Sequence, residues 1–464
     1  MLRSLSVHTR FVIAFAALMF LVRLFHITNP PVEVAHNWRQ TTSMMVARNF
    51  HQLDNNILYP TIDETGEMRG VVGMEFPAIP YAIHLVSIPF GYAHWYGRLI
   101  VLIIVSLGAW YFFLLVRSFI AEKTAAWATI LFGASSLFHL GRKVMPDPAA
   151  LSLVIIALYY GFNYLKTGGV MKLLGYFLFA ALGTLIKIPF GLYLALLAFP
   201  FFNPSTPLRR KILFASTSIV VLVMVWWWYF SWNVHLSATF GQWYNSGKPL
   251  ATGAAELLSH GWEVAERFYY SAYQAYIWGI LSLAGILYLL FKGNRIVVGV
   301  TAVILPLIIL SMMKSGSLFT HHGYYALILV PWLALSGAMI LEKLHPRLAM
   351  VLLAVGFAES VANQQHDFFI KPSALQKLQL EEIANSVCRP GELVGLVSNA
   401  NPNEFYFLNR KGWLVNPEQC NTTHLGNLAN LGCAFLFVPQ HRLPIDIPYS
   451  VVFSNEHYTV YQLK

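Results

Sequence analysis

Long apolar segments recur along this 464-residue chain and constrain its fold more than any other feature. A helix of about 20 apolar residues crosses a bilayer. Because the segments continue along most of the chain, the first is not merely a removable signal peptide. The pattern predicts an all-α polytopic membrane protein with about 11 transmembrane helices, placed at about 11–27, 99–116, 125–141, 148–165, 172–187, 189–202, 212–231, 274–291, 296–313, 324–341 and 347–361.

Charge is scarce and unevenly placed. Charged residues make up 11% of the chain, against roughly 25% in soluble proteins. The formal net charge of +10 comes mostly from Lys and Arg in short loops, as the positive-inside rule requires of cytoplasmic loops. We therefore expect membrane lipids, and no nucleic acid, as surroundings. Arg3 and Arg10 precede the first segment, so the N-terminus is predicted to be cytoplasmic.

The first outer loop, residues 28–98, collects polar and charged side chains in an otherwise apolar chain. Within it, Trp38–Leu53 contains no Pro or Gly and predicts an amphipathic helix on the membrane surface. Residues 76–92 are apolar but contain three prolines, so they predict a re-entrant or interfacial piece rather than a span. We therefore expect residues that carry out the chemistry to lie in this loop.

Composition changes again after the last apolar segment. Helical patterns at 373–386 and 422–431 alternate with strand-like runs at 393–397 and 434–438, and the segment 449–462 ends in β-branched and aromatic residues. They predict a small soluble α/β domain, residues 363–464, after a transmembrane domain of residues 1–362. An odd number of spans places this domain on the outer face. All three cysteines lie in it, and their odd count leaves any disulfide pairing open.

Two ionisable residues stand at the ends or breaks of predicted spans. Asp147 begins a span and is followed by Pro148. A carboxylate there can simply cap the helix, but its basic neighbours Arg142 and Lys143 favour a function. Lys187 lies between two short apolar segments, and an ionisable group at that depth indicates function unless it snorkels from a helix end.

A polar cluster, Thr320–Tyr325, precedes another span and includes His321, His322, Tyr324 and Tyr325. Paired histidines can bind metal, but no carboxylate stands at ligand spacing, so we assign no metal ligands and expect hydrogen bonds to phosphate or sugar. The chain has no P-loop and no G-x-S-x-G motif. A donor that arrives through the membrane is therefore expected rather than a cytoplasmic nucleotide.

Seven stretches in this order resemble the GT-C class of membrane glycosyltransferases, in particular the protein O-mannosyltransferase and aminoarabinose-transferase group with its bacterial relatives. The resemblance covers most of the first 340 residues. It is carried by HNWRQTTSMMVARNF at 36–50, ILYPTID at 57–63, GMEFPAIPY at 73–81, GRL at 97–99, RKVMPD at 142–147, LIKIPFGLY at 185–193 and HHGYYALILVPWLAL at 321–335.

The resemblance implies a GT-C fold and a polyprenyl-phosphate sugar as donor, with a lipid, glycan or protein as acceptor, on the outer face of a bacterial inner membrane. In such enzymes an acidic residue of the first outer loop acts as base on the acceptor, and cations hold the donor phosphate. Asp147 matches the second acidic position of the family, and Lys187 matches a basic position that resembles a phosphate contact. The family uses both metal-assisted and metal-free chemistry, which leaves participation of a divalent cation open, and no cofactor is assigned.

The chain departs from the common family pattern in the outer loop. Arg39 and Gln40 stand where an Asp-Glu pair is usual, and Glu75 stands where a Lys is usual. We therefore predict that Arg39 and Glu75 face each other with exchanged roles, Glu75 as base or base-orienting group and Arg39 as phosphate or sugar clamp. Glu33 is a competing base.

Other polar residues are assigned by the same comparison. His36, Arg142, Lys187, His321, His322, Tyr324 and Tyr325 are expected to bind substrate. Asp54 and Asp63 are weaker candidates for the base, whereas Arg48 and Asn49 are expected to fix the loop helix rather than to touch substrate.

Two other functional classes stay open. A transporter or flippase of a lipid-linked sugar often has two related halves and ionisable residues near mid-membrane, but this sequence shows no internal repeat. A non-catalytic envelope scaffold would be consistent with the exchanged charges of Arg39 and Glu75. Indifference of its function to substitution of Glu75, Asp147 and Lys187 would indicate such a scaffold.

Overall fold

The computed structural model describes residues 5–241, 247–399, 401–442 and 447–464. Arg3, which contributed to the predicted orientation, lies outside the described residues. The chain divides into two compact units. Unit 1 comprises Met1–Ile27, Arg98–Phe230 and Asn245–His366, and unit 2 comprises Thr28–Gly97, Ser231–Tyr244 and Asp367–Lys464.

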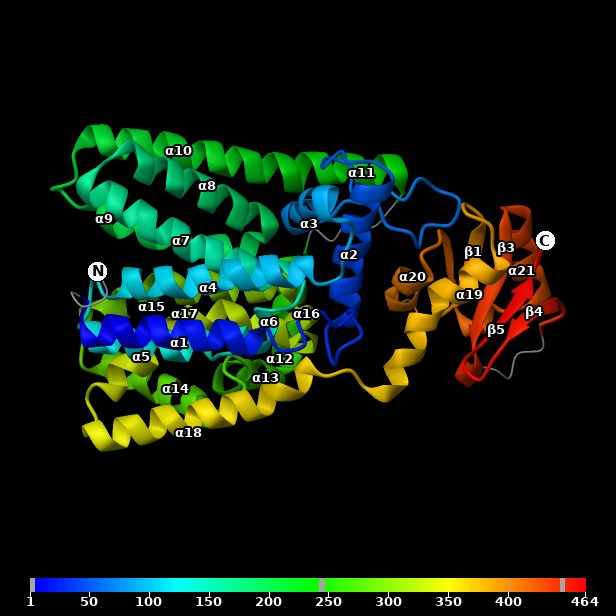
Figure 1. Ribbon diagram of the computed structural model, residues 1–464. Helices are drawn as coiled ribbons and strands as arrows, with labels where there is room; N and C mark the ends of the chain where they lie inside the picture. The colour runs from blue at the N-terminus through cyan, green and yellow to red at the C-terminus, as the bar shows by residue number, and fades with distance from the viewer. Residues whose placement is uncertain (1–4, 242–246, 400, 443–446) are drawn as a thin grey trace. The chain divides into compact units, whose positions relative to one another are not determined.

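Unit 1 is a helical bundle (Figure 1) in which α7 packs against α8, and α17 contacts both α5 and α14. Its elements are α1 (Val7–Arg23), α4 (Tyr96–Val116), α5 (Glu122–Gly133), α6 (Leu137–Leu140), α7 (Pro146–Thr167), α8 (Val170–Ile186), η2 (Ile188–Leu197), α9 (Ala198–Phe202), α10 (Leu208–Trp226), α12 (Leu250–Ser259), α13 (Gly261–Glu266), η4 (Arg267–Ser271), α14 (Tyr276–Phe291), α15 (Arg295–Ser315), α16 (Ser317–His321), η5 (Gly323–Leu329), α17 (Val330–Leu341) and α18 (Pro346–Gln364).

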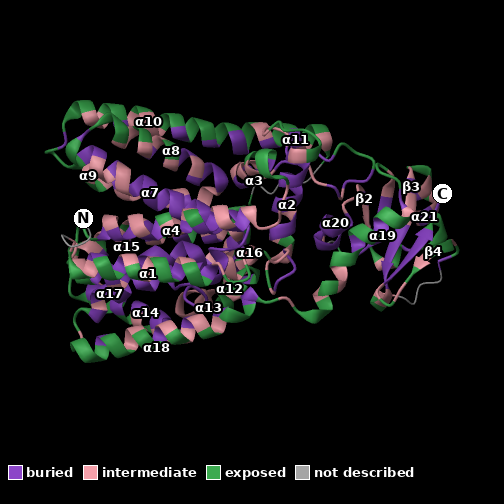
Figure 2. Cartoon of the chain, viewed as in Figure 1, coloured by how far each residue is buried: buried purple, intermediate pink, exposed green. Residues whose placement is uncertain are grey.

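These helices are apolar on their exposed sides as well as on their buried ones. The most apolar 18-residue stretch of α7 is 78% buried. That of the long helix Leu208–Phe240, which begins with α10, is only 28% buried. Along α10 the exposed side chains include Ile219, Leu222 and Trp226, and Figure 2 shows this helix largely exposed. A helix that is hydrophobic all round requires an apolar surrounding, so the outer helices of the bundle are suited to contact with lipid.

Among the described residues, six helices are long and apolar enough to cross a membrane, or seven if the bent pair Gly261–Ser271 and Tyr276–Phe291 counts as one span. The expected count of about 11 is not confirmed. The predicted first span is a helix of 17 residues that ends at Arg23, and α5 has 12 residues. The apolar segments on either side of Lys187 form α8 and the shorter η2 and α9, because the chain leaves helical geometry at Lys187.

Unit 2 contains the outer loop, with helices α2 (Asn37–Gln52) and α3 (Ala78–Phe90). The predicted loop helix is thus confirmed as α2, but the expectation that its apolar side faces the membrane is wrong, because that side packs against protein. All residues from Gln40 to Phe50 are buried except the half-buried Thr42, since α2 packs against α3 and against α20 (Asn403–Leu408). The apolar stretch at 76–92 forms one short helix, α3, as expected for a piece that does not span the membrane.

The C-terminal part of unit 2 is an α/β fold built on a five-stranded sheet of order β2-β1-β3-β5-β4. Strand β1 pairs in parallel with β2 and β3, whereas β5 pairs antiparallel with β3 and β4. The predicted small sheet is confirmed, and the three cysteines are free and buried in the described structure. The further elements are η3 (Trp227–Trp232), α11 (Asn233–Phe240), η6 (Gln365–Phe368), η7 (Pro372–Gln379), α19 (Leu380–Val387), β1 (Leu393–Val397), β2 (Gly412–Val415), η8 (Pro417–Gln419), α21 (Thr422–Asn430), β3 (Cys433–Pro439), η9 (Gln440–Arg442), β4 (Ser450–Ser454) and β5 (Tyr458–Gln462).

Candidate active site

Arg39 and Glu75 face each other in unit 2, as the exchanged charges of the sequence predict. Arg39 lies in the first turn of α2, and its Nη2 donates to Oε1 of Glu75 at 2.5 Å. The two side chains are 25% and 19% exposed, so substrate can reach them. Asn233 donates from Nδ2 to the carbonyl of Met74 at 2.8 Å, which fixes the backbone next to Glu75.

The other end of α2 is held by a buried polar cluster. Arg48 donates from Nη2 to Oδ2 of Asp63 at 2.7 Å, and Asn49 donates from Nδ2 to Oδ1 of Asp63 at 2.8 Å. A second Arg48 nitrogen, Nη1, donates to the carbonyl of Tyr406 at 2.7 Å. Arg48 and Asn49 therefore fix the helix, as expected, and both carboxylate oxygens of Asp63 are engaged by α2.

The chain enters α2 through a constrained backbone. Ala35 and His36 have φ values of 60° and 59°, a region that costs energy for residues other than glycine and clusters at functional sites. Glu33, the competing base, is fully buried, and Asn29 donates from Nδ2 to its Oε1 at 3.2 Å. Since Glu75 is partly exposed and Glu33 is not, the geometry favours Glu75 as the carboxylate that meets an acceptor.

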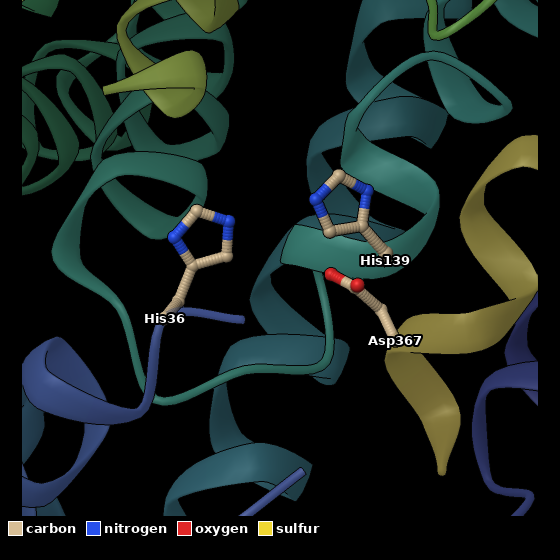
Figure 3. A group of neighbouring side chains, drawn as sticks. All are labelled: His36, His139 and Asp367. Carbon is tan, nitrogen blue, oxygen red and sulfur yellow. The ribbon is translucent and has the colours of Figure 1, made fainter. Parts of the chain in front are cut away.

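His36 also has an acidic neighbour that the sequence analysis missed. A ring nitrogen of His36 and a carboxylate oxygen of Asp367 lie within 4.8 Å of each other (Figure 3). An imidazole and a carboxylate at this separation can supply two ligands to a divalent ion. The third side chain of Figure 3, His139, comes from α6 in unit 1, where its Nδ1 lies 2.6 Å from Oε1 of Gln364. The acidic residue in QHDFF, six residues after the end of the last predicted span, was the available sequence signal.

In unit 1 the structure brings together two of the singled-out segments. Lys187 follows α8 in extended backbone, and its Nζ lies 5.9 Å from the centroid of the Tyr325 ring. His322 stacks with Tyr324 and Tyr325 at centroid distances of 5.3 and 6.0 Å. A cation above a tyrosine ring, beside a stacked imidazole, offers both charge and hydrogen-bonding groups to a phosphate or a sugar.

His321 lies apart from this stacked group. It is exposed, and its Nδ1 is 2.6 Å from the carbonyl of Ser317. The backbone before it is held by Arg267, a residue that the sequence analysis did not single out. Arg267 donates from Nε to the carbonyl of Phe319 at 3.3 Å and from Nη2 to that of Thr320.

Asp147, in α7, and Arg142, in the turn before α7, are both buried. Asp147 lies in the first turn and is 2% exposed. Arg142 donates from Nε to the carbonyl of Arg23 at 3.1 Å and from Nη2 to that of Phe25 at 2.9 Å. Arg142 thus fixes the end of α1, and its contact with substrate stays a prediction.

Glu64 is a further carboxyl that the sequence analysis overlooked. It directly follows Asp63, and burial raises its pKa to about 7. A carboxyl group with a pKa near the working pH can exchange protons with substrate. The only sequence signal was the adjacent acidic pair in IDETG.

A protein-family model matches the part of the chain that contains several of these candidate residues. Residues 75–230, which include Glu75, Arg142, Asp147 and Lys187, match the family model described as dolichyl-phosphate-mannose-protein mannosyltransferase. No curated protein is detectably similar to the chain in sequence.

Solved structures match over a much larger part of the chain. ArnT from Cupriavidus metallidurans in the apo state is similar over 99% of both chains, with a TM-score of 0.60 and 14% identity. ArnT bound to undecaprenyl phosphate matches with a TM-score of 0.59 and 13% identity, over 98% of each chain. The oligosaccharyltransferase of Archaeoglobus fulgidus in the apo form has a TM-score of 0.57 at 12% identity, over 93% of this chain and 69% of its own. The predicted GT-C fold is thereby confirmed.

Proposed function

We propose that this chain, which has the fold of the GT-C membrane glycosyltransferases, moves a sugar from polyprenyl phosphate to a lipid, glycan or protein on the outer face of the membrane. The donor class is supported by the solved relatives. One ArnT structure is bound to undecaprenyl phosphate, and AglB from Archaeoglobus fulgidus is in complex with an inhibitory peptide and a dolichol-phosphate. The family model over residues 75–230 supports the same chemistry.

The Arg39–Glu75 pair is the observation that carries this proposal. In the proposed reaction Glu75 takes the proton from an acceptor hydroxyl as its oxygen attacks the anomeric carbon of the sugar. The bond from that carbon to the phosphate oxygen breaks, and polyprenyl phosphate leaves with the electron pair. Arg39 orients the carboxylate and binds phosphate or sugar through charge-assisted hydrogen bonds.

The residues of unit 1 serve the donor in this proposal. Lys187, beside Tyr325, neutralises the phosphate charge that develops as the sugar leaves. His322 and Tyr324 offer hydrogen bonds to the sugar or the phosphate. Asp147 matches the family's second acidic position, and we propose that it takes part in the same reaction.

The test is a transfer assay with the purified protein in lipid. Radiolabelled polyprenyl-phosphate sugars are supplied with a membrane extract as the source of acceptors, and the wild type is compared with Asp147→Asn and Glu75→Gln. Label that leaves the polyprenyl pool with the wild type but with neither variant supports the proposal. Label that crosses the bilayer of sealed vesicles without leaving the pool would indicate a transporter instead.

A further inference from the structure

A segment of unit 1 that the proposed function does not use exposes large apolar side chains. It consists of α12, α13 and η4, and runs from residue 249 to the start of α14. Leu258 is 83% exposed and Trp262 is 73% exposed. Large apolar groups this exposed, on a chain that spans a membrane, call for an apolar or amphipathic surrounding.

The direction of this segment follows from its join to α14. The helix Gly261–Ser271 and the helix Tyr276–Phe291 are bent by 100° relative to each other. When α14 is placed along the bilayer normal, the 100° bend turns Gly261–Ser271 nearly parallel to the membrane plane. A helix in that position belongs to the boundary between headgroups and acyl chains.

Two close backbone contacts fix the position of the segment on α14 and α15. A Cβ on Gly279 would lie 1.8 Å from the carbonyl oxygen of Tyr269, so η4 packs directly on α14 at that point. Gly279 lies three residues after Tyr276, or about 4.5 Å inside the helix at 1.5 Å per residue. Similarly, a Cβ on Gly253 would lie 1.7 Å from the carbonyl oxygen of Met313, two residues before the end of α15.

Polar contacts hold the segment at these two helix ends. Lys248 lies 2.6 Å from Oε2 of Glu256 and donates to Oγ of Ser317 at 2.9 Å. Glu256 also accepts from the backbone nitrogen of Ser317 at 2.7 Å, which ties α12 to the chain just after α15. Glu359 of α18 accepts from the first two backbone nitrogens of α14, at 2.9 and 3.2 Å. The segment is therefore part of the packed bundle.

One face of the segment is aromatic. The rings of Trp262 and Tyr269 are 5.8 Å apart, and the ring of Tyr269 stacks with that of Tyr276 at 6.0 Å. Because Tyr276 is the first residue of α14 and is 50% exposed, this face continues onto α14. Glu263 follows Trp262 and points about 100° away from it around the helix.

From these contacts we infer that α12, α13 and η4 form an interfacial anchor, with Leu258, Trp262 and the Tyr269–Tyr276 stack inserted at the headgroup boundary of the lipid bilayer. The partner is the lipid surface itself. Trp and Tyr combine an apolar ring with a polar group and are enriched at this depth. Arg267, the first residue of η4, belongs to this anchor and donates hydrogen bonds to the backbone before His321.

Depth-dependent quenching tests the anchor directly. Trp262→Cys and Glu263→Cys are each labelled with the environment-sensitive fluorophore NBD and placed in phosphatidylcholine vesicles that contain lipid spin-labelled near the headgroup. The native cysteines are buried and label slowly. We expect the probe at 262 to be quenched at least about twofold more than the probe at 263, and to emit at shorter wavelength.

Leu258→Cys supplies a second position on the apolar surface, should Trp262→Cys unfold. Equal quenching at 263 and at both apolar positions would overturn the inference. So would stronger quenching by lipid labelled at the bilayer centre, because it would place the segment in the hydrocarbon core. The assay reads position and is independent of any transfer activity.

Discussion

Four carboxyl groups of the outer loop, which look alike in the sequence, have four different environments. Asp54 is exposed and 3.2 Å from Arg69, whereas Asp63 is buried between Arg48 and Asn49. Burial raises the pKa of Glu64 to about 7, and Glu75 is partly exposed and bonded to Arg39. These environments, rather than residue type, make Glu75 the best candidate for the base.

The raised pKa of Glu64 predicts a pH-dependent contribution to stability. The carboxyl titrates near its ordinary value of 4.5 in the unfolded chain and near 7 in the folded one. Its contribution is therefore fully present below pH 4.5 and is lost as the pH rises through 7. Relative to Glu64→Gln, the wild type should lose about 1–3 kcal/mol of unfolding free energy between pH 5 and pH 8.

Thermal unfolding at the two pH values measures this difference for Glu64. The exposed neighbour Glu67, changed to Gln, is the matched control and should show a much smaller pH dependence. If wild type and Glu64→Gln keep the same difference in Tm at both pH values, the carboxyl does not change its protonation on folding.

At the scale of elements, helices and strands with a clear local pattern could be predicted, and contacts between distant segments could not. Helix α2 and strand β1 were expected within a residue or two of their observed bounds. Strand β2 has four residues and α20 has six, too few to show a period. The burial of α2 depends on Tyr406, 358 residues further along the chain, which no local pattern reveals.

For the candidate site too, some contacts could be predicted from the sequence and others could not. The departure from the family pattern predicted that Arg39 and Glu75 face each other, because opposite charges exchanged at two positions imply a pair. The contact of Lys187 with Tyr325 joins two segments that were singled out separately. Asp367 and Glu64 were missed, because a lone acidic residue or an adjacent acidic pair does not show in the sequence whether its carboxyl group is buried or which side chain it faces.

The buried polar cluster at the end of α2 predicts that two ion pairs of the outer loop contribute unequally to stability. Asp63→Asn leaves Arg48 buried without its counter-charge and should cost about 3–5 kcal/mol of unfolding free energy. Asp54→Asn breaks the exposed pair with Arg69 and should cost at most about 1 kcal/mol. Thermal unfolding of both variants checks this, and equal losses of stability would contradict a structural role for Asp63.

For the whole molecule, the distribution of charge predicts an orientation. Lys292 lies in the short loop between α14 and α15, and Arg295 is the first residue of α15, as expected on the cytoplasmic side. The proposed chemistry places the outer loop and the C-terminal α/β part on the opposite side. The exposed apolar surface of the outer helices requires the bilayer in either orientation.

Reporter fusions in bacteria test the orientation. Alkaline phosphatase, which is active only after export, should be active when fused after Lys464 and inactive when fused at Gly293. A green fluorescent protein reporter should give the inverse pattern. Activity of the phosphatase at Gly293 together with inactivity at Lys464 would reverse the proposed topology and place the transfer reaction on the cytoplasmic face.

The central claim concerns one carboxylate, so the most direct measurement compares Glu75→Gln with Glu67→Gln in a single-turnover transfer assay from a labelled polyprenyl-phosphate sugar. Loss of the general base should slow transfer by about 100-fold or more while donor binding stays within about threefold of the wild type. Glu67→Gln, a change of an exposed acid in the same loop, should transfer at the wild-type rate. Transfer by Glu75→Gln at the wild-type rate would show that Glu75 is not the base and would contradict the account.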